Sequence, residues 1–323
     1  MPRPGARQVR LIGALAAAAA SVALAGCGGD DARRTQAALT SPGTGGTLTW
    51  ALAGRPGELD PLLAASRWDQ LVTRQIHEPL VEALARPFRD PRRLRRGLAA
   101  FWHKSAGGSV WTFRLRPDVR FQDGTPLNGG AVLANAKRWR TTPQGRALLP
   151  GLFAADSPRP GLVRFQLDRP DPDFPERLSS PRTGIVSPRA LDPHSGVEAK
   201  LGRQLRSGTG PFELRESDRG GVVLARNLDW WGTGRDLGPA LDQVEFRVVE
   251  KGQDRLALLS GGDVQVAEAL TPSLATEARS DPLLEVIGDG ASALGLQRSV
   301  RGITRADEIP SLSAVWLTRV GTG

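Results

Sequence analysis

The segment from residue 110 to residue 140 constrains the fold most, because it reads as a strand, a turn and a helix in succession. Apolar and polar side chains alternate along 110–116, which predicts a strand with one buried face. The residues at 123–126 favour a turn, and 131–140 has helical spacing with Asn128 in place to cap the helix. The buried set would be Trp111, Phe113 and Leu115, or their neighbours if the register slips by one residue. This segment predicts a mixed α/β architecture.

The rest of the chain continues the α/β pattern without an internal repeat. Alternation and β-branched runs predict further strands at 47–53, 162–167, 212–215, 222–226, 244–249, 264–267 and 283–287. Helical spacing predicts helices at 68–84, interrupted at Pro79, and at 253–259 and 273–279. Gly220 and Gly221 favour a hairpin over 211–226, and the Pro-rich stretch 168–195 favours loops.

The N-terminus predicts export and lipid attachment. Residues 1–10 carry three Arg and no acid, and 11–25 is an apolar run too short to span a bilayer, as in a secretory signal. The sequence Leu24-Ala25-Gly26-Cys27 matches the bacterial lipobox, and Cys27 is the only Cys in the chain. We therefore expect a signal peptide over 1–26, lipidation at Cys27 and a flexible tether over 27–46. A plain signal peptide with an incidental Cys is the alternative.

The formal net charge of +9 is weak evidence for a nucleic-acid partner. Removal of residues 1–26 would take away three Arg and no acid, and an exported protein does not meet cytoplasmic DNA. The densest basic segment, Arg86 to Arg96, holds six Arg against the single acid Asp90. It is either a solvated loop or a contact for anionic lipid head groups, which the anchor would hold nearby.

Several segments, taken in order, resemble family 5 of the extracellular solute-binding proteins, the peptide- and nickel-type receptors of ABC importers. The opening strand with its Leu59-Asp60-Pro61 turn is similar to the start of that family. The stretch 111–127 (WTFRLRPDVRFQDGTPL) is similar to the family signature YTFHLRKGVKFHDGTPF. Further similar segments are 76–81 (IHEPLV), 208–212 (GTGPF), 226–232 (RNLDWWG) and 244–267. Together the resemblance covers roughly 46–296.

The resemblance implies a type II periplasmic-binding-protein-like fold with a mixed-sheet lobe and a smaller inserted subdomain. The main lobe would comprise 47–66 and 181–323, and the subdomain 67–180. The chain is shorter than the family, and residues 294–301 run directly from a strand similar to the one before the second lobe into a segment similar to the family's C-terminus. The second lobe is therefore expected to be largely missing, with 310–317 as the terminal strand.

The resemblance also implies function: a membrane-anchored, extracytoplasmic solute-binding component of an ABC importer for peptides or similar solutes, partnered by a permease and an ATPase. The alternative is a non-transporting surface lipoprotein, a sensor, scaffold or degenerate binding protein built on one lobe. A ligand face, if one exists, is expected near Trp50, Ala51, His77, Gly208, Thr209, Gly210 and Trp231. Trp230 and Trp231 read first as core or hairpin-closing aromatics and second as ligand-stacking rings.

No pattern in the chain predicts an enzyme, a metal site or a cofactor. The three His (His77, His103 and His194) are scattered, and G-x-S-x-G, H-E-x-x-H and P-loop motifs are absent from the sequence. Asp168, Asp171 and Asp173 are separated by prolines and lack a following glycine-centred calcium loop, which favours a solvated loop. We expect a binding protein rather than an enzyme.

Overall fold

A computed structural model describes residues 45–83, 94–191, 207–233, 238–288, 293–301 and 316–317. These residues belong to one compact unit that spans Ser41–Gly323. The predicted signal peptide, Cys27 and most of the predicted tether lie outside the described residues, as does most of the Arg-rich segment. Among the described residues, no helix has both the length and the apolar character needed to cross a membrane.

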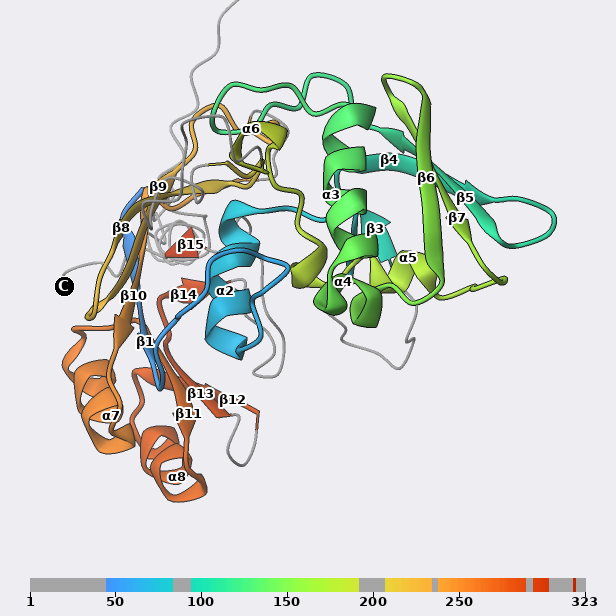
Figure 1. Cartoon of the computed structure of the whole chain (residues 1–323). Helices are drawn as coiled ribbons and strands as arrows, with labels where there is room; N and C mark the ends of the chain where they lie inside the picture. The colour runs from blue at the N-terminus through green and yellow to red at the C-terminus, as the bar shows by residue number, and fades with distance from the viewer. Residues whose placement is uncertain are drawn as a thin grey trace, which may run out of the picture. The chain divides into compact units, whose positions relative to one another are not determined.

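The larger sheet has seven strands in the order β12-β13-β11-β1-β10-β9-β8 (Figure 1). Strand β1 pairs in parallel with β10 and β11, and the remaining pairs are antiparallel, so the sheet is mixed as predicted. Its strands are β1 (Thr47–Leu52), β8 (Phe212–Ser217), β9 (Gly221–Arg226), β10 (Gln243–Val248), β11 (Val266–Leu270), β12 (Leu284–Ile287) and β13 (Ala293–Gln297).

Strand β1 lies in the middle of this sheet and is covered on both faces. Leu48, Trp50 and Leu52 point into one core, which also receives Leu71, Val72 and Ile76 from helix α2 (Arg67–Ile76). Ala51 points to the opposite face, where helices α7 (Gly252–Gly261) and α8 (Pro272–Ser280) form a second core. Opposite orientation of successive side chains explains this division, and a central parallel strand is commonly apolar on both faces.

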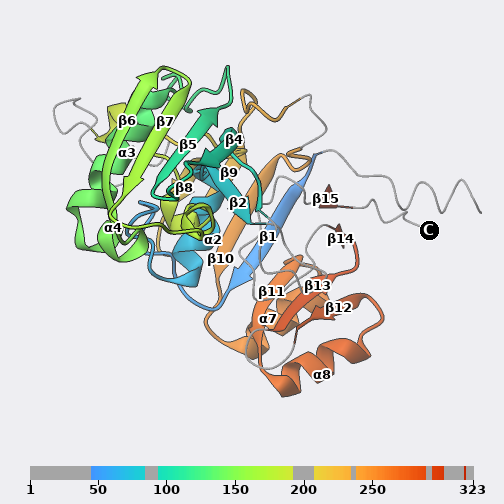
Figure 2. The same ribbon diagram turned by 90° about the vertical axis from the view of Figure 1, so that its right-hand side faces the viewer.

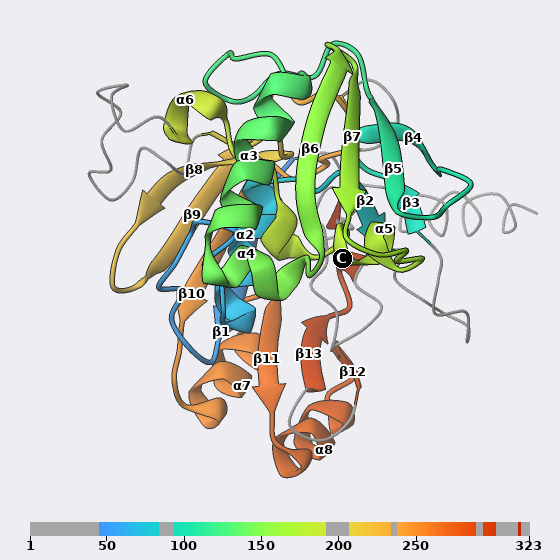
Figure 3. The ribbon, with the colours of Figure 1, turned by 45° about the vertical axis from the view of Figure 1, so that its right-hand side comes forward.

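The smaller sheet has four antiparallel strands in the order β4-β5-β7-β6, and helix α3 (Gly129–Thr141) packs along β6 and β7 (Figure 3). Its strands are β4 (Ala99–Lys104), β5 (Val110–Leu115), β6 (Leu152–Arg159) and β7 (Leu162–Leu167). Trp111, Phe113 and Leu115 are all buried, so the first of the two predicted registers for β5 is confirmed. The centre of this core is aromatic, with Phe113 and Phe165 edge to face at 5.5 Å.

Short helices and two-stranded pairs make up the rest of the described fold (Figure 2). They are β2 (Val81–Ala83) paired with β3 (Leu94–Arg96), helices α4 (Pro143–Leu148), α5 (Phe174–Arg177) and α6 (Pro188–Leu191), the 3-10 turn η1 (Pro181–Thr183), and β14 (Val300–Arg301) paired with β15 (Trp316–Leu317). Helix α2, which the predicted division assigns to the inserted subdomain, packs with the core of the seven-stranded sheet. The division itself stays a prediction.

The predicted helix over 68–84 is wrong beyond residue 76. Helix α2 begins at a capping box, in which Ser66 accepts from the Asp69 amide, and it ends where His77 adopts an extended conformation. Leu80 and Val81 then continue into β2 and pack in the core of the smaller sheet. Leu80 and Val81 continue the helical spacing of the apolar residues in α2 only because both segments are buried. They are buried in different cores.

Candidate functional site

Three neighbouring segments lie where the chain passes between the two sheets: 76–81 on the way out, and 184–187 and 207–212 on the way back. The Gly210 amide donates to the Ile76 carbonyl at 2.8 Å, and the Ile185 amide donates to the Glu78 carbonyl at 3.0 Å. The Ser187 amide donates to the Ser207 carbonyl at 2.9 Å. These bonds satisfy the backbone of buried connections, which otherwise would carry unpaired polar groups.

Two glycines allow the third crossing segment to lie against the end of α2. A Cβ on Gly208 would fall 1.8 Å from the Ile76 carbonyl oxygen, and one on Gly210 would fall 2.4 Å from the Gln75 carbonyl oxygen. The Gln122 amide, in the loop after β5, donates to the Gly208 carbonyl at 2.9 Å. The Gly-Thr-Gly pattern is therefore explained by close backbone approach.

A buried carboxyl group, that of Glu78, occupies the centre of this crossing. It accepts hydrogen bonds from the Thr209 hydroxyl at 2.9 Å and from the Trp231 indole at 2.8 Å. The Trp230 indole donates to its other oxygen at 3.3 Å. Glu78 therefore joins the end of α2 to the segments before β8 and after β9, and Thr209, Trp230 and Trp231 are oriented by one side chain.

Burial dominates the electrostatics of Glu78. Loss of hydration raises the pKa of its carboxyl to about 8, and the nearby Glu82 adds to that rise, while the three donors partly oppose it. Glu82 itself pairs with Arg95 across the β2–β3 ribbon. Glu78 is thus an uncharged acid through most of the neutral range.

Trp231 is the member of this group that reaches solvent. Its ring is half-buried, and the Arg116 guanidinium lies over it at 4.4 Å from the ring centroid, a cation–π contact. Arg116 also donates to the Gly97 carbonyl at 2.7 Å, which fixes the guanidinium over the indole. Trp230 is buried beside it, with the two ring centroids 5.3 Å apart.

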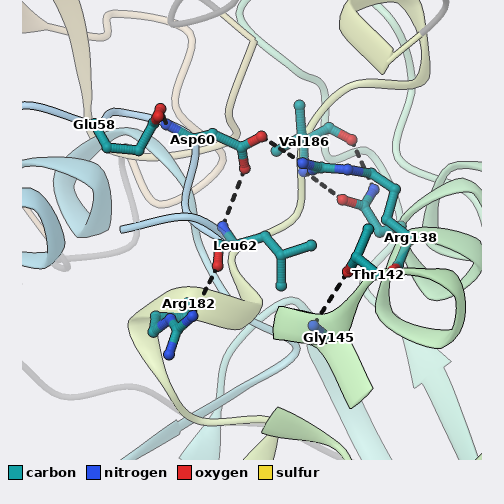
Figure 4. A network of polar contacts seen from close by, with 9 residues as sticks. Glu58, Asp60, Leu62, Arg138, Thr142, Gly145, Arg182 and Val186 are labelled. Atoms are coloured by element: carbon teal, nitrogen blue, oxygen red, sulfur yellow. Dashed lines mark hydrogen bonds and ion pairs between the residues drawn. The ribbon is translucent and has the colours of Figure 1, made fainter. Parts of the chain in front are cut away.

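His77 lies on the other side of the same crossing and lines a cavity of about 190 Å³. The Asp60–Arg138 ion pair forms the polar part of this cavity, and Figure 4 shows the two side chains directed toward each other. The His77 side chain is 1% exposed, and burial lowers the pKa of its imidazole to about 4, with the charge of Asp60 opposing that shift. At neutral pH the ring is uncharged.

Of the residues predicted for a ligand face, the structure brings five together and separates two from them. Thr209 and Trp231 donate to the Glu78 carboxyl, and Gly208 and Gly210 lie against the segment 75–77, which includes His77. Trp50 and Ala51 are fully buried within β1, on opposite faces of the seven-stranded sheet. A ligand contact by Trp50 or Ala51 would require displacement of packed side chains, so the binding role of these two residues stays an untested prediction.

Sequence reasoning missed Glu78 and Arg116, although both lie inside segments that were singled out. Glu78 is an acid between two apolar stretches, and an acid in a buried connection needs donors, which Thr209, Trp230 and Trp231 supply. Arg116 ends the alternating strand pattern and looks like an ordinary solvated residue. Only the tertiary contact with Trp231 distinguishes it.

The three aspartates at 168–173 form a loop, as predicted. Asp171 accepts from the Asp173 amide at 2.9 Å and pairs with Arg177 at 3.0 Å, so its carboxylate holds the start of α5. Within the part of the chain that the structure describes, no group of three or more His, Cys, Asp or Glu side chains is arranged to hold a metal ion.

Comparisons with known proteins, by sequence and by fold, both match this chain to binding proteins. The model of the bacterial extracellular solute-binding proteins, family 5 middle, matches residues 93–303. Two similar proteins of Escherichia coli strain K12 are the "Probable D,D-dipeptide-binding periplasmic protein DdpA", 29% identical over 221 residues, and the glutathione-binding protein GsiB, 27% identical over 237 residues. The chain spans 42% and 43% of their lengths, and the matches take up 68% and 71% of this chain.

Solved structures with the same fold are also binding proteins. The periplasmic binding protein AgaA of A. tumefaciens in complex with agropinic acid matches with a TM-score of 0.66 at 24% identity, over 75% of this chain and 48% of that one. DppA of Helicobacter pylori in complex with the peptide STSA matches with a TM-score of 0.62 at 21% identity, over 78% and 51%. The fold is thus that of the type II periplasmic binding proteins over about half of their length, and this family binds solutes rather than catalysing reactions. The chain belongs to the bacterial extracellular solute-binding proteins of family 5.

Proposed function

We propose that this protein is the extracytoplasmic solute-binding component of an ABC importer and that its solutes are short peptides or similar molecules. The observation that carries the proposal is the family match over residues 93–303, together with relatives named for binding a D,D-dipeptide and glutathione. A permease and an ATPase would be its partners. We further propose that lipid on Cys27 anchors it to the outer face of the cell membrane, because the lipobox supplies a use for the only Cys.

The half-buried ring of Trp231 supports the choice of a binding surface. The Arg116 guanidinium lies over the ring, and the Glu78 carboxyl accepts a hydrogen bond from the indole N–H. The ring is therefore fixed before a ligand binds. An indole held in place with a cation over its ring suits a peptide group or a ligand carboxylate at its exposed part, and a preorganised contact loses little entropy on binding. The other predicted residues of this group would act by holding Trp231 and the crossing segments in place.

A thermal-shift screen tests the proposal. The full chain without its signal would be melted alone and with D-Ala-D-Ala, L-dipeptides, tetrapeptides and glutathione. A ligand that binds only the folded state raises the apparent melting temperature, and the rise grows with ligand concentration. Replacement Trp231→Phe keeps a ring but removes the indole donor to Glu78, and we expect weaker binding. Leu228→Ala, at a residue that is 76% exposed, is the matched control.

The second candidate is a surface lipoprotein that does not transport. The chain spans less than half the length of the relatives named above. The same screen separates the two candidates. Absence of any concentration-dependent shift across peptides, glutathione and metal chelates would contradict the solute-binding proposal and leave the second.

A further inference from the structure

We propose that the smaller sheet docks on membrane lipids with anionic head groups through its outer face, the side turned away from helix α3. Two cross-strand rows define this outer face, and each takes one residue from β4, β5, β7 and β6 in turn. The first row is Phe101, Arg114, Leu162 and Arg159, and the second is His103, Thr112, Arg164 and Asp156. The contact is separate from the peptide surface proposed at Trp231 and from the lipid proposed on Cys27.

Strand alternation places the two rows on one face of the sheet. Phe113 and Phe165 point into the core beneath α3, which covers that side of the sheet (Figure 3), so their neighbours along β5 and β7 point outward. The register continues this direction across the sheet, because Arg114 lies opposite Phe101 on one side and Leu162 on the other. The outer face is therefore a set of neighbouring side chains and not a scatter of exposed positions.

The first row alternates apolar and cationic side chains across all four strands. Phe101 is 47% exposed, and Arg114 and Arg159 are exposed as well. Among the described residues Arg114 has no acidic partner, whereas Arg164 in the second row is paired with Asp156, with 2.9 Å between Nε and Oδ1. A guanidinium binds phosphate through several donors, and an aromatic ring beside it can enter the boundary between head groups and acyl chains. An anionic lipid surface satisfies both kinds of side chain in this row.

The charges of the chain are divided between the two sheets. Residues 99–167, which span β4 to β7, include ten Lys or Arg and three Asp or Glu. Residues 207–301, which span most of the larger sheet, include ten Lys or Arg and fifteen Asp or Glu. An anionic surface therefore attracts the smaller sheet and repels the larger one, which orients the molecule. Nucleic acid carries the same charge but has no apolar layer for Phe101, so the outer face favours membrane lipid.

Vesicle sedimentation tests the proposal with residues 27–323 carrying Cys27→Ser, which removes both the predicted signal and the lipid. We expect binding to vesicles of phosphatidylcholine and phosphatidylglycerol in equal amounts, and at least about tenfold weaker binding to phosphatidylcholine alone. Binding to the mixed vesicles should also weaken when salt is raised from about 0.1 M to about 1 M, because the Debye length shrinks from about 10 Å to about 3 Å.

Two substitutions on the outer face should weaken this binding. Arg114→Gln removes one cation and should lower the partition coefficient about fivefold, since each Lys or Arg near an anionic surface contributes about that factor. Phe101→Ala removes the apolar contact and should cause a loss of similar size. The matched controls are Arg219→Gln and Leu228→Ala, at exposed positions in the connections of the larger sheet, and both should leave binding unchanged.

A fluorescent label locates the contact even if a variant on the outer face does not fold. Cys27 is the only Cys, so a chain with Cys27→Ser can be labelled at one introduced thiol. A polarity-sensitive dye attached after His103→Cys should shift to shorter wavelength with the mixed vesicles. The same dye attached after Leu228→Cys should not respond, because that position belongs to the acidic part of the chain.

Equal binding to neutral and mixed vesicles, undiminished binding of both Arg114→Gln and Phe101→Ala, or equal dye responses at the two labelled positions would each overturn the proposal. It would also be overturned by a salt-sensitive dimer that forms without vesicles and to which the dye at position 103 responds. That result would mean that the outer face meets the acidic part of a second copy. Thermal shifts with peptides, measured without lipid, report on the proposed function separately.

Discussion

Among single residues, Glu78 should make the clearest pH-dependent contribution to the stability of the fold. Its pKa is raised from 4.5 in the unfolded chain to about 8 in the folded protein, so the folded state holds the proton over that whole interval. Stability must therefore fall as pH rises from 4.5 to 8 on account of this group. His77 acts in the opposite sense between about 4 and 6.5, because there the unfolded state binds the extra proton. Above 6.5 only the Glu78 effect remains of these two.

The replacement Glu78→Gln should remove this dependence. Gln keeps one oxygen as an acceptor for Thr209 and the Trp231 indole, places its NH2 group on the side of the Trp230 indole, and does not titrate. Between pH 6.5 and pH 8 the unsubstituted protein should lose about 2 kcal/mol more unfolding free energy than the variant, from a limit of about 1.4 kcal/mol per pH unit. Urea unfolding at several pH values measures the difference. Parallel curves for the two proteins would contradict a raised pKa at Glu78.

Gly208 should tolerate no side chain, because the approach to Ile76 leaves no room for a Cβ. We expect Gly208→Ala to destabilise the fold by about 3 kcal/mol through backbone displacement. Gly161→Ala is the matched control, since nothing lies within 4 Å of a Cβ built at Gly161. Urea midpoints give the comparison. Equal effects at the two positions would show that the crossing segments can separate without cost.

Among the elements, α3 depends on a cap that the sequence itself indicates. The Asn128 side chain accepts from the Ala131 amide at 3.0 Å, and the first turn of α3 contains no acidic residue. Asn128→Ala should therefore cost about 1 kcal/mol, and Asn128→Ser should restore most of it, since Ser caps comparably. Chemical denaturation measures both. A Ser variant as unstable as the Ala variant would mean that another contact of Asn128 matters more than the cap.

In the four-stranded sheet, the strands that were predicted from the sequence and those that were missed differ in their place. The central strands β5 and β7 were predicted closely. Each has a neighbouring strand on both sides, and its side chains therefore alternate regularly between the two faces of the sheet. Strands β4 and β6 were missed, and they are the two edges of the four-stranded sheet. Strand β6 carries Pro158 and has two register shifts, which an edge strand tolerates and which erase the alternating pattern. These two edge strands are defined by their partner more than by their own residues, whereas β8 and β12, the edges of the larger sheet, were predicted from their own residues.

The candidate site was predicted in part for a similar reason. The Gly-Thr-Gly segment, His77 and Trp231 could be singled out from local sequence, but the contacts that unite them pass through Glu78, 131 residues from Thr209 along the chain. The burial of Ala51 could not be inferred from its own strand, because alternation does not say whether the second face is also covered. Helices α7 and α8, far along the chain, supply that cover.

On the scale of the whole molecule, two of the three apolar cores, one from each sheet, are joined through the buried crossing at Glu78. One core belongs to the four-stranded sheet and includes Phe165, and the other belongs to the seven-stranded sheet and includes Phe246. Both phenylalanines are fully buried. Because the crossing segments exchange backbone hydrogen bonds and share the Glu78 carboxyl, opening one core would expose polar groups of the other. We expect the two cores to unfold together.

Phe165→Ala and Phe246→Ala test this coupling, one in each core. Each should cost about 4 kcal/mol, and each should move a single calorimetric transition to lower temperature without splitting it. The calorimetric and van't Hoff enthalpies should agree in both variants. If Phe165→Ala instead produced two transitions, with the later one at the temperature of the unsubstituted protein, the smaller sheet would unfold independently. The Glu78 crossing would then be a hinge between two stable parts rather than a bond between them.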